Sequence, residues 1–127
     1  MKKTVKTGKA PAAVGPYSQA VKAGGFLFIS GQLGIDPERG RLVEGGIEEQ
    51  TKMALKNIEA ILSEVGSNMD ALVKTTVYLK SIEDFAKMNG VYEGFFSSDF
   101  PARAAFEVAN LPLGALVEIE AVAYLPK

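Results

Sequence analysis

The chain has 127 residues, of which 47% are hydrophobic and 23% charged, a composition typical of one soluble globular domain spanning residues 1–127. Its net charge is −1, so the composition indicates no basic surface for nucleic acid or for an anionic membrane. Cysteine and histidine are both absent, which excludes disulfides, thiolate nucleophiles and the commonest metal ligand. Acid–base chemistry near neutral pH must therefore use Asp, Glu, Lys or Tyr.

The N-terminal segment has lysines but no apolar stretch of the kind found in signal peptides. No run approaches the roughly 20 apolar residues of a membrane helix. A cytoplasmic protein is the expectation.

The first third of the chain predicts strands joined by glycine-rich turns. Residues 3–6 are expected to form a short edge strand, and residues 8–18, punctuated by Gly and Pro, an ordered loop. Residues 19–31 indicate a hairpin, because two apolar segments flank Gly24-Gly25, a pair suited to a tight turn with positive φ. Residues 32–46 are expected to be a long loop.

A helical period follows. Apolar and small residues recur at spacings of three and four from Ile47 to Val65, and Gly66 suits the position after a helix end. Residues 71–80 alternate like a strand, with Val73, Thr75, Val77 and Leu79 on one face.

A second helix is predicted after this strand. Residues 81–84 resemble a capping box with Asp in place of Glu. The helix that they open carries one apolar stripe, formed by Ile82, Phe85, Met88, Tyr92 and Phe95. Two last strands are expected at about 103–109 and 115–125. The order β-β-β-α-β-α-β-β predicts an α+β domain whose six-stranded mixed sheet has two helices on one face.

The last strand has apolar residues on both faces. Val117, Ile119, Ala121 and Ala123 point one way, whereas Leu116, Val122 and Tyr124 point the other way beside Glu118 and Glu120. A strand with one solvated face alternates more cleanly than this. We therefore expect the second face to pack against other copies of the chain, with a pocket between subunits that holds the charged residues.

Arg103, Glu118 and Glu120 are the charged residues that a core strand does not explain. Arg103 shares a strand face with Ala105 and Glu107, and the two glutamates share a face of the last strand. If these strands pair, an arginine and a glutamate share a surface. One interpretation is a cross-strand ion pair that steadies the sheet. The other is a site in which Arg103 binds a substrate anion while a glutamate handles a proton.

Four other positions have both a structural and a functional interpretation. Tyr17 is either a packed ring or a pocket residue, and Asn89 either a solvated helix residue or a ligand contact. Ser30 and Gly31 either end a strand or let a ligand approach the backbone closely. The glycines at 40, 45 and 46 form no phosphate-binding motif.

Together these stretches resemble the RidA/YjgF family, also called the RutC or L-PSP family. The resemblance is carried, nearly from end to end, by GPYSQAV, FISGQLGIDP, EEQTKMALKNIEAIL, SIEDFAKMNGVYEGFF, FPARAAFEV and LPLGALVEIEAVA. It implies a chorismate-mutase-like fold, a homotrimer and ligand clefts at the three subunit interfaces. Its enamine/imine deaminase branch hydrolyses reactive 2-imino and enamino acids, such as 2-iminobutanoate and 2-iminopropanoate, to 2-oxo acids and ammonia.

The resemblance also assigns residues. Arg103 of PAR is expected to hold the substrate carboxylate, and Glu118, the first glutamate of EIEA, to activate water. The remaining contacts that it implies are Tyr17, Ser30, the backbone of Gly31, Asn89, the backbone of Ala105, and Pro112. Many relatives have a hydroxyl residue or a cysteine after the arginine, where this chain has Ala104 and Ala105, so only backbone contacts are expected there.

No metal or cofactor is expected, because an imine is already electrophilic and one partly buried carboxylate can act as base and then acid. Two alternatives stay open. Family members have been described as translation inhibitors with ribonuclease activity, which the net charge and the missing histidine disfavour here. The other alternative is a trimer that binds small ligands in the same cleft without turnover.

Overall fold

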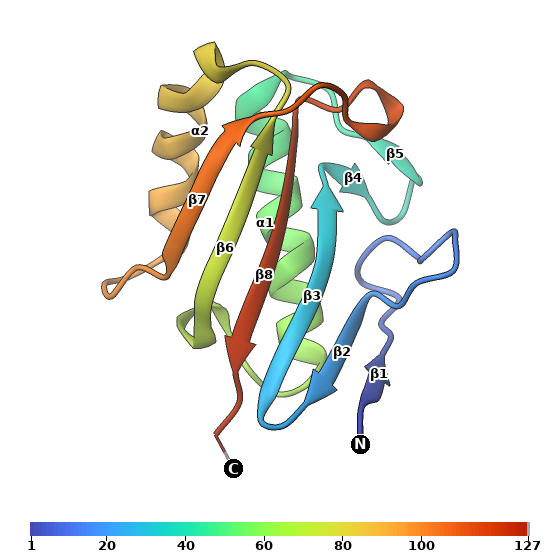
Figure 1. Cartoon of the computed structure of the whole chain (residues 1–127). Helices are drawn as coiled ribbons and strands as arrows, with labels where there is room; N and C mark the ends of the chain where they lie inside the picture. Colours follow the sequence, from blue (N-terminus) through green and yellow to red (C-terminus); the bar gives the residue numbers. More distant parts are fainter. Residues whose placement is uncertain (127) are drawn as a thin grey trace.

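The computed structural model describes residues 1–126 and confirms the α+β prediction (Figure 1). Its main sheet has six strands in the order β1-β2-β3-β8-β6-β7. In chain order these strands are β1 (Lys3–Val5), β2 (Ala20–Ala23), β3 (Phe26–Leu33), β6 (Leu72–Leu79), β7 (Ala102–Glu107) and β8 (Val117–Tyr124). All neighbours run antiparallel except β6 and β7, which are parallel, so the sheet is mixed.

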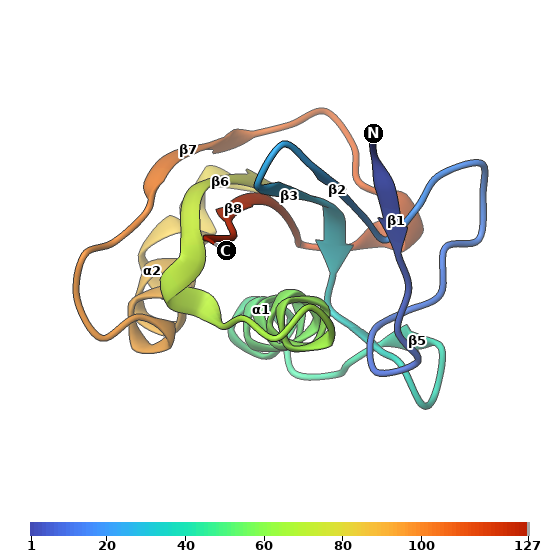
Figure 2. The same ribbon diagram turned by 90° about the horizontal axis from the view of Figure 1, so that it is seen from below.

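Helices α1 (Ile47–Glu64) and α2 (Phe85–Tyr92) cover one face of this sheet (Figure 2). Short 3-10 turns flank these elements at Met69–Ala71, Ile82–Asp84, Glu93–Phe95 and Pro112–Gly114. No helix of residues 1–126 lies on the opposite face, which we call the open face. The core lies between α1 and the sheet, and its largest fully buried side chains include Leu27, Leu55, Ile58, Leu79 and Ile119. No helix within residues 1–126 is long and apolar enough to cross a membrane.

The first helix forms where its periodicity predicted. Its buried residues fall at spacings of three and four, and Gly66 follows it with φ 74°, a conformation that glycine adopts without steric cost. The second helix begins differently from the prediction. Ser81 caps a 3-10 turn by accepting a hydrogen bond from the Glu83 amide, and Ile82 is 49% exposed instead of joining the buried stripe.

The strands also differ from the predictions in detail. The run 32–46 is not a simple loop: β3 continues through Leu33, and β4 (Ile35–Asp36) pairs with β5 (Arg41–Leu42) in a small ribbon. In β6 the register shifts between Leu72 and Lys74, so Leu72 replaces the 44% exposed Val73 on the buried face. The extra residue of a bulge reverses the alternation on one side of it.

The largest correction concerns the last two strands, which do not pair. The residues between them span the end of the sheet, and β6 lies between β7 and β8. The register places Arg103 beside Thr75 and Thr75 beside Ala121. A cross-strand pair between Arg103 and a glutamate of β8 is therefore ruled out.

Gly34 fixes how β3 approaches α1. A Cβ atom added there would lie 2.6 Å from the carbonyl oxygen of Gln50 and 2.7 Å from its Cα, which is helix backbone that cannot rotate away. Gly34→Ala is expected to lower the free energy of unfolding by about 1–3 kcal/mol, as other overpacking substitutions do. Gly8→Ala is the matched control, because its Cβ would meet no atom within 4 Å. Urea unfolding of both variants tests this, and equal stabilities would contradict the packing argument.

Candidate active site

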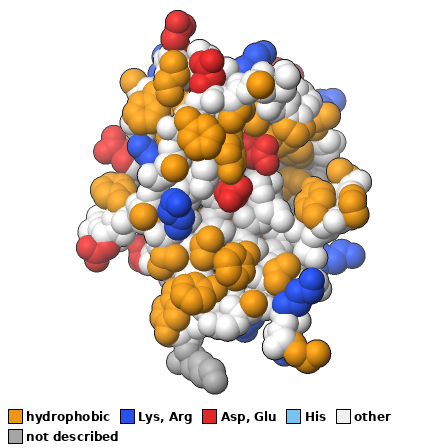
Figure 3. Space-filling model, in the orientation of Figure 1, with side chains coloured by type: hydrophobic (Ala, Val, Ile, Leu, Met, Phe, Trp, Pro, Cys, Tyr) orange, Lys and Arg blue, Asp and Glu red, His pale blue; other side chains and the backbone are white. Residues whose placement is uncertain are grey.

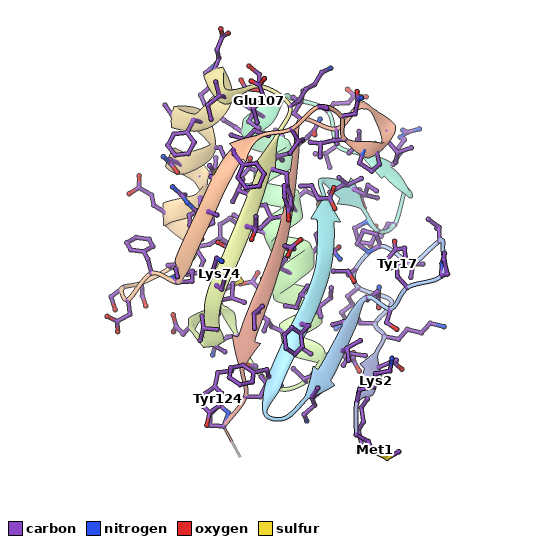
Figure 4. The ribbon with its side chains drawn as sticks, in the orientation of Figure 1. Met1, Lys2, Tyr17, Lys74, Glu107 and Tyr124 are labelled. Atoms are coloured by element: carbon purple, nitrogen blue, oxygen red, sulfur yellow. The ribbon has the colours of Figure 1, made fainter. Side chains whose placement is uncertain are left out.

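A cavity of about 790 Å³ lies between the N-terminal loop, the bulged part of β3 and the turn before β8. Its lining includes five of the predicted site residues, namely Tyr17, Ser30, Gly31, Pro112 and Glu118. Most of the other lining side chains are apolar, among them Val14, Leu33, Ile35 and Leu113. In Figure 4, Tyr17 lies on the loop beside β2 and β3, far from Glu107 at the end of β7. We call this cavity the Glu118 pocket.

Glu118 is the only acidic residue among those that line this pocket. Its pKa lies above the ordinary value for a glutamate, first because burial penalises the charged carboxylate and second because the Glu120 carboxylate lies nearby. A carboxylate in this state takes and returns a proton near neutral pH more readily than an exposed one.

Gly31 makes room for this carboxylate. A Cβ atom at position 31 would overlap the Glu118 carboxylate oxygen and lie 2.8 Å from its Cδ. The sequence suggested that the glycine admits a ligand to the backbone. In the structure, its missing side chain is first of all what allows Glu118 to lie against β3.

A β-bulge places Ser30 and Gly31 together opposite Glu120. The register between β3 and β8 shifts between Ile29 and Gln32, so one extra residue of β3 has no partner in the ladder. The Ser30 hydroxyl donates a 2.6 Å hydrogen bond to the Ser18 carbonyl, which leaves its oxygen lone pairs as acceptors for a ligand. Leu113, at the turn bordering the pocket, is 71% exposed and has φ 60°, a left-handed conformation rarely adopted by a leucine.

Glu120 has a different role from Glu118. Its Oε1 accepts a 2.7 Å hydrogen bond from the Tyr78 hydroxyl on β6. This bond, together with burial and the two glutamate charges, raises the pKa of Tyr78 to about 12. Tyr78 therefore stays a protonated donor at neutral pH and holds Glu120 in place.

Arg103 and Asn89 lie in a second cavity of about 540 Å³, lined also by Tyr92, Glu93, Phe100 and Pro101. Arg103 Nη1 donates a 2.7 Å hydrogen bond to Asn89 Oδ1. Within residues 1–126, the one ion pair at 4.0 Å or less joins Arg39 and Asp36. No carboxylate of these residues therefore lies within 4.0 Å of the Arg103 guanidinium. We call this cavity the Arg103 pocket. Ala105, two residues further along β7, lines neither cavity.

The two pockets lie on opposite faces of the sheet. Arg103 is in register with Thr75, which is fully buried under the helices, and contacts Asn89 on α2. Glu118 alternates with the buried Val117 and Ile119, so its side chain lies on the open face. One copy of the chain cannot bring these two side chains to the same small molecule.

The sequence predictions missed three side chains that hold Glu120 and Arg103 in place. Tyr78 was not singled out in the sequence, and Phe85 and Tyr92 were assigned only to a core stripe. The rings of Phe85 and Tyr92 both face the Arg103 guanidinium. The helical spacing of Phe85, Asn89 and Tyr92 was visible in the sequence, but their common partner on β7 was not.

Comparisons with known proteins agree with this fold. The sequence model of the family described as Endoribonuclease L-PSP matches residues 7–125. The chain is 54% identical over 123 residues to the 2-iminobutanoate/2-iminopropanoate deaminase of Bos taurus, covering 97% of this chain and 90% of that protein.

Two solved structures are similar over almost the whole chain. A putative endoribonuclease from Thermotoga maritima superimposes with a TM-score of 0.96 at 47% identity and covers 100% of both chains. TdcF from E. coli, solved with bound serine, gives a TM-score of 0.93 at 35% identity, covering 98% of this chain and 99% of that one.

The raised pKa of Glu118 generates a prediction about its neighbour. Glu120→Gln removes one of the two causes, so the pKa of Glu118 is expected to fall, while burial keeps it above the ordinary value. Titration of the side-chain carboxyl carbons by ¹³C NMR measures this. Glu107→Gln is the matched control, because Glu107 accepts a hydrogen bond from the Ile82 amide on the other face. An unchanged Glu118 pKa in Glu120→Gln would contradict the coupling.

Proposed function

The chain belongs to the Endoribonuclease L-PSP (RidA/RutC) family, and we propose that it is a hydrolytic deaminase of small reactive 2-imino and enamino acids. Its products are then 2-oxo acids and ammonia, with 2-iminobutanoate and 2-iminopropanoate as the expected substrates. The relatives named 2-iminobutanoate/2-iminopropanoate deaminase support this, since the chain matches them over nearly its whole length. A cytoplasmic location remains a prediction.

The observation that carries the proposal is Glu118, a half-buried carboxylate of raised pKa in a mostly apolar pocket. Imine hydrolysis needs one group that accepts a proton from water and returns it to nitrogen. A carboxylate whose pKa is raised toward the working pH does both. Neither a metal nor a covalent nucleophile is required, because the C=N carbon is electrophilic.

The reaction follows from these groups. Water is held by Glu118 and attacks the carbon of the protonated imine while the carboxylate accepts a proton from the water. The C=N electron pair moves to nitrogen, which becomes a neutral amino group. Glu118 then gives the proton to this amino nitrogen of the carbinolamine. The C–N bond breaks as the carbonyl forms, and the hydroxyl proton passes through Glu118 to the departing ammonia, which leaves as ammonium and restores the carboxylate. The Ser30 hydroxyl donates its hydrogen bond to the Ser18 carbonyl, so its oxygen is left as an acceptor for a substrate N–H.

Arg103 is the proposed anchor for the substrate carboxylate. A guanidinium binds a carboxylate through two parallel hydrogen bonds, and no carboxylate of residues 1–126 pairs with this one. Because Arg103 and Glu118 lie on opposite faces of one sheet, the complete site requires Arg103 from one copy and Glu118 from the next. Such a heterologous contact repeats around a closed ring, and we propose the homotrimer that the family resemblance implies.

The open face supports such an assembly. Apolar side chains gather over the lower part of this face and again over its upper part, with acidic groups between them (Figure 3). The lower group is an aromatic cluster in which the Phe26 ring lies 5.5 Å from that of Tyr124 and 6.5 Å from that of Phe28. These three rings are 39–49% exposed in the single chain. Contact with other copies would remove them from water and enclose the Glu118 pocket.

The ribonuclease alternative has less support in this chain. RNA binding depends on neutralising phosphates, whereas the net charge here is −1 and both Glu118 and Glu120 lie on the open face. The chain also has no histidine for acid–base catalysis. A binding trimer without turnover differs from the deaminase only in its kinetics.

Matched variants of the two glutamates test the catalytic assignment. Glu118→Gln keeps the shape of the side chain but removes the base, so kcat for imine hydrolysis is expected to fall roughly 10²–10⁴-fold. Glu120→Gln leaves the base in place, so its effect on kcat is expected to be smaller. The substrate is generated continuously from threonine by a pyridoxal-phosphate dehydratase, and 2-oxobutanoate release is measured above the rate in buffer.

Two outcomes would contradict the assignment. If Glu120→Gln is inactive while Glu118→Gln is near the parent protein, the base is wrongly assigned. If the parent protein itself does not exceed the rate in buffer, the deaminase proposal fails and the binding trimer is favoured.

A further inference from the structure

The Arg103 guanidinium lies against an aromatic and amide surface on α2. Its Cζ atom is 4.8 Å from the centre of the Tyr92 ring and 5.4 Å from that of the Phe85 ring, both within the range of a cation–π contact. Asn89, which lies between Phe85 and Tyr92 in the sequence, accepts a 2.7 Å hydrogen bond from the same guanidinium. Phe85, Asn89 and Tyr92 follow one another at spacings of four and three, so all three face β7, which runs beside α2 in Figure 1.

Tyr92 is itself fixed from the sheet. Its hydroxyl forms a 2.6 Å hydrogen bond with the Thr75 hydroxyl, and the two residues are 4% and 0% exposed. Burial raises the pKa of Tyr92, although the Thr75 bond and the Arg103 charge oppose the shift, so the phenol stays protonated at neutral pH. The Phe96 ring also packs against it, with the two ring centres 5.1 Å apart. The ring that faces Arg103 therefore has little freedom to move.

This arrangement holds the cation without using up its donors. A guanidinium has five N–H groups, and a ring face attracts the charge without accepting a directed hydrogen bond. Asn89 takes one N–H, and no carboxylate of residues 1–126 lies within 4.0 Å. Had a carboxylate held Arg103 in place, it would compete with an anionic ligand for the same N–H groups. Rings do not compete in this way.

We propose that Tyr92 and Phe85 are positioning residues that hold the Arg103 guanidinium ready for the substrate carboxylate, with Thr75 fixing Tyr92. This inference rests on the proposed function, since it takes Arg103 as the anchor. The carboxylate does not change during imine hydrolysis, so the anchor binds ground state and transition state alike. Loss of a positioning ring should therefore raise KM and leave kcat nearly unchanged.

The variants separate positioning from packing. Tyr92→Leu removes the ring, and KM is expected to rise about tenfold with kcat within about twofold. Tyr92→Phe keeps the ring and loses only the Thr75 bond, so a rise of about threefold or less is expected. Thr75→Val removes the same hydrogen bond from the other side. The double variant Tyr92→Phe/Thr75→Val should therefore have a KM no higher than that of the more affected single variant.

A core variant controls for stability. Ile61→Val removes one methyl group from the fully buried face of α1 and is expected to lower Tm. Its KM is expected to equal that of the parent protein. Affinity for 2-oxobutanoate, measured by calorimetry, gives a second readout that does not depend on turnover, and it should weaken in Tyr92→Leu by the same factor as KM.

The outcomes distinguish this inference from the function on which it rests. If Arg103→Ala leaves KM and 2-oxobutanoate binding unchanged, the anchor itself is wrong. If Arg103→Ala weakens both while Tyr92→Leu behaves like Ile61→Val, only the positioning role is overturned. A fall in kcat without a rise in KM in Tyr92→Leu would also overturn it, whereas a rise in KM that Tyr92→Phe largely rescues supports it.

Discussion

Strand β6 lies between β7 and β8, and the arrangement of the site depends on this one feature of the sheet. It separates the cation from the carboxylate by a full strand, and the register then places their side chains on opposite faces. An internal ion pair between Arg103 and Glu118 is thereby prevented. Each group is left available for a ligand. One copy of the chain alone cannot present both groups to the same ligand. Assembly and activity are therefore coupled in our account.

The two pockets are prepared by different physical means. On the open face, burial and a neighbouring carboxylate raise the pKa of Glu118, and the absent side chain of Gly31 gives that carboxylate its place. On the helix face, aromatic rings and one amide hold the Arg103 guanidinium in place, and no carboxylate of residues 1–126 pairs with it. A proton carrier needs an adjustable pKa, whereas an anchor needs fixed charge and fixed geometry. The surroundings of each group meet its own requirement.

Periodicity was sufficient for the two helices, for the six strands of the main sheet and for the buried face of β8, because burial against α1 follows the spacing of side chains directly. It located α1, its terminal Gly66 and the buried side of β8. Periodicity failed where the structure depends on which strands pair, since strands far apart in the sequence can be neighbours in the sheet. The strands that carry Arg103 and Glu118 are consecutive in sequence, yet β7 pairs in parallel with β6. Bulges near Val73 and Ser30 were likewise not visible, since an extra residue in a ladder depends on the partner strand. Most candidate site residues were visible in the sequence, their roles came from the family resemblance, and their division between two faces came only from the structure.

The most direct measurement of the central claim is activity in mixed assemblies of two impaired variants, assayed at a substrate concentration well below the KM of Arg103→Ala. Arg103→Ala and Glu118→Gln are unfolded together in equal amounts, refolded, and checked by sedimentation for the same assembly as the parent protein. A site shared between copies is restored wherever an intact Arg103 meets an intact Glu118, so random mixing should give about a quarter of the parent activity. A site contained within one copy would give no activity beyond that of the separate variants, and that result would contradict the account.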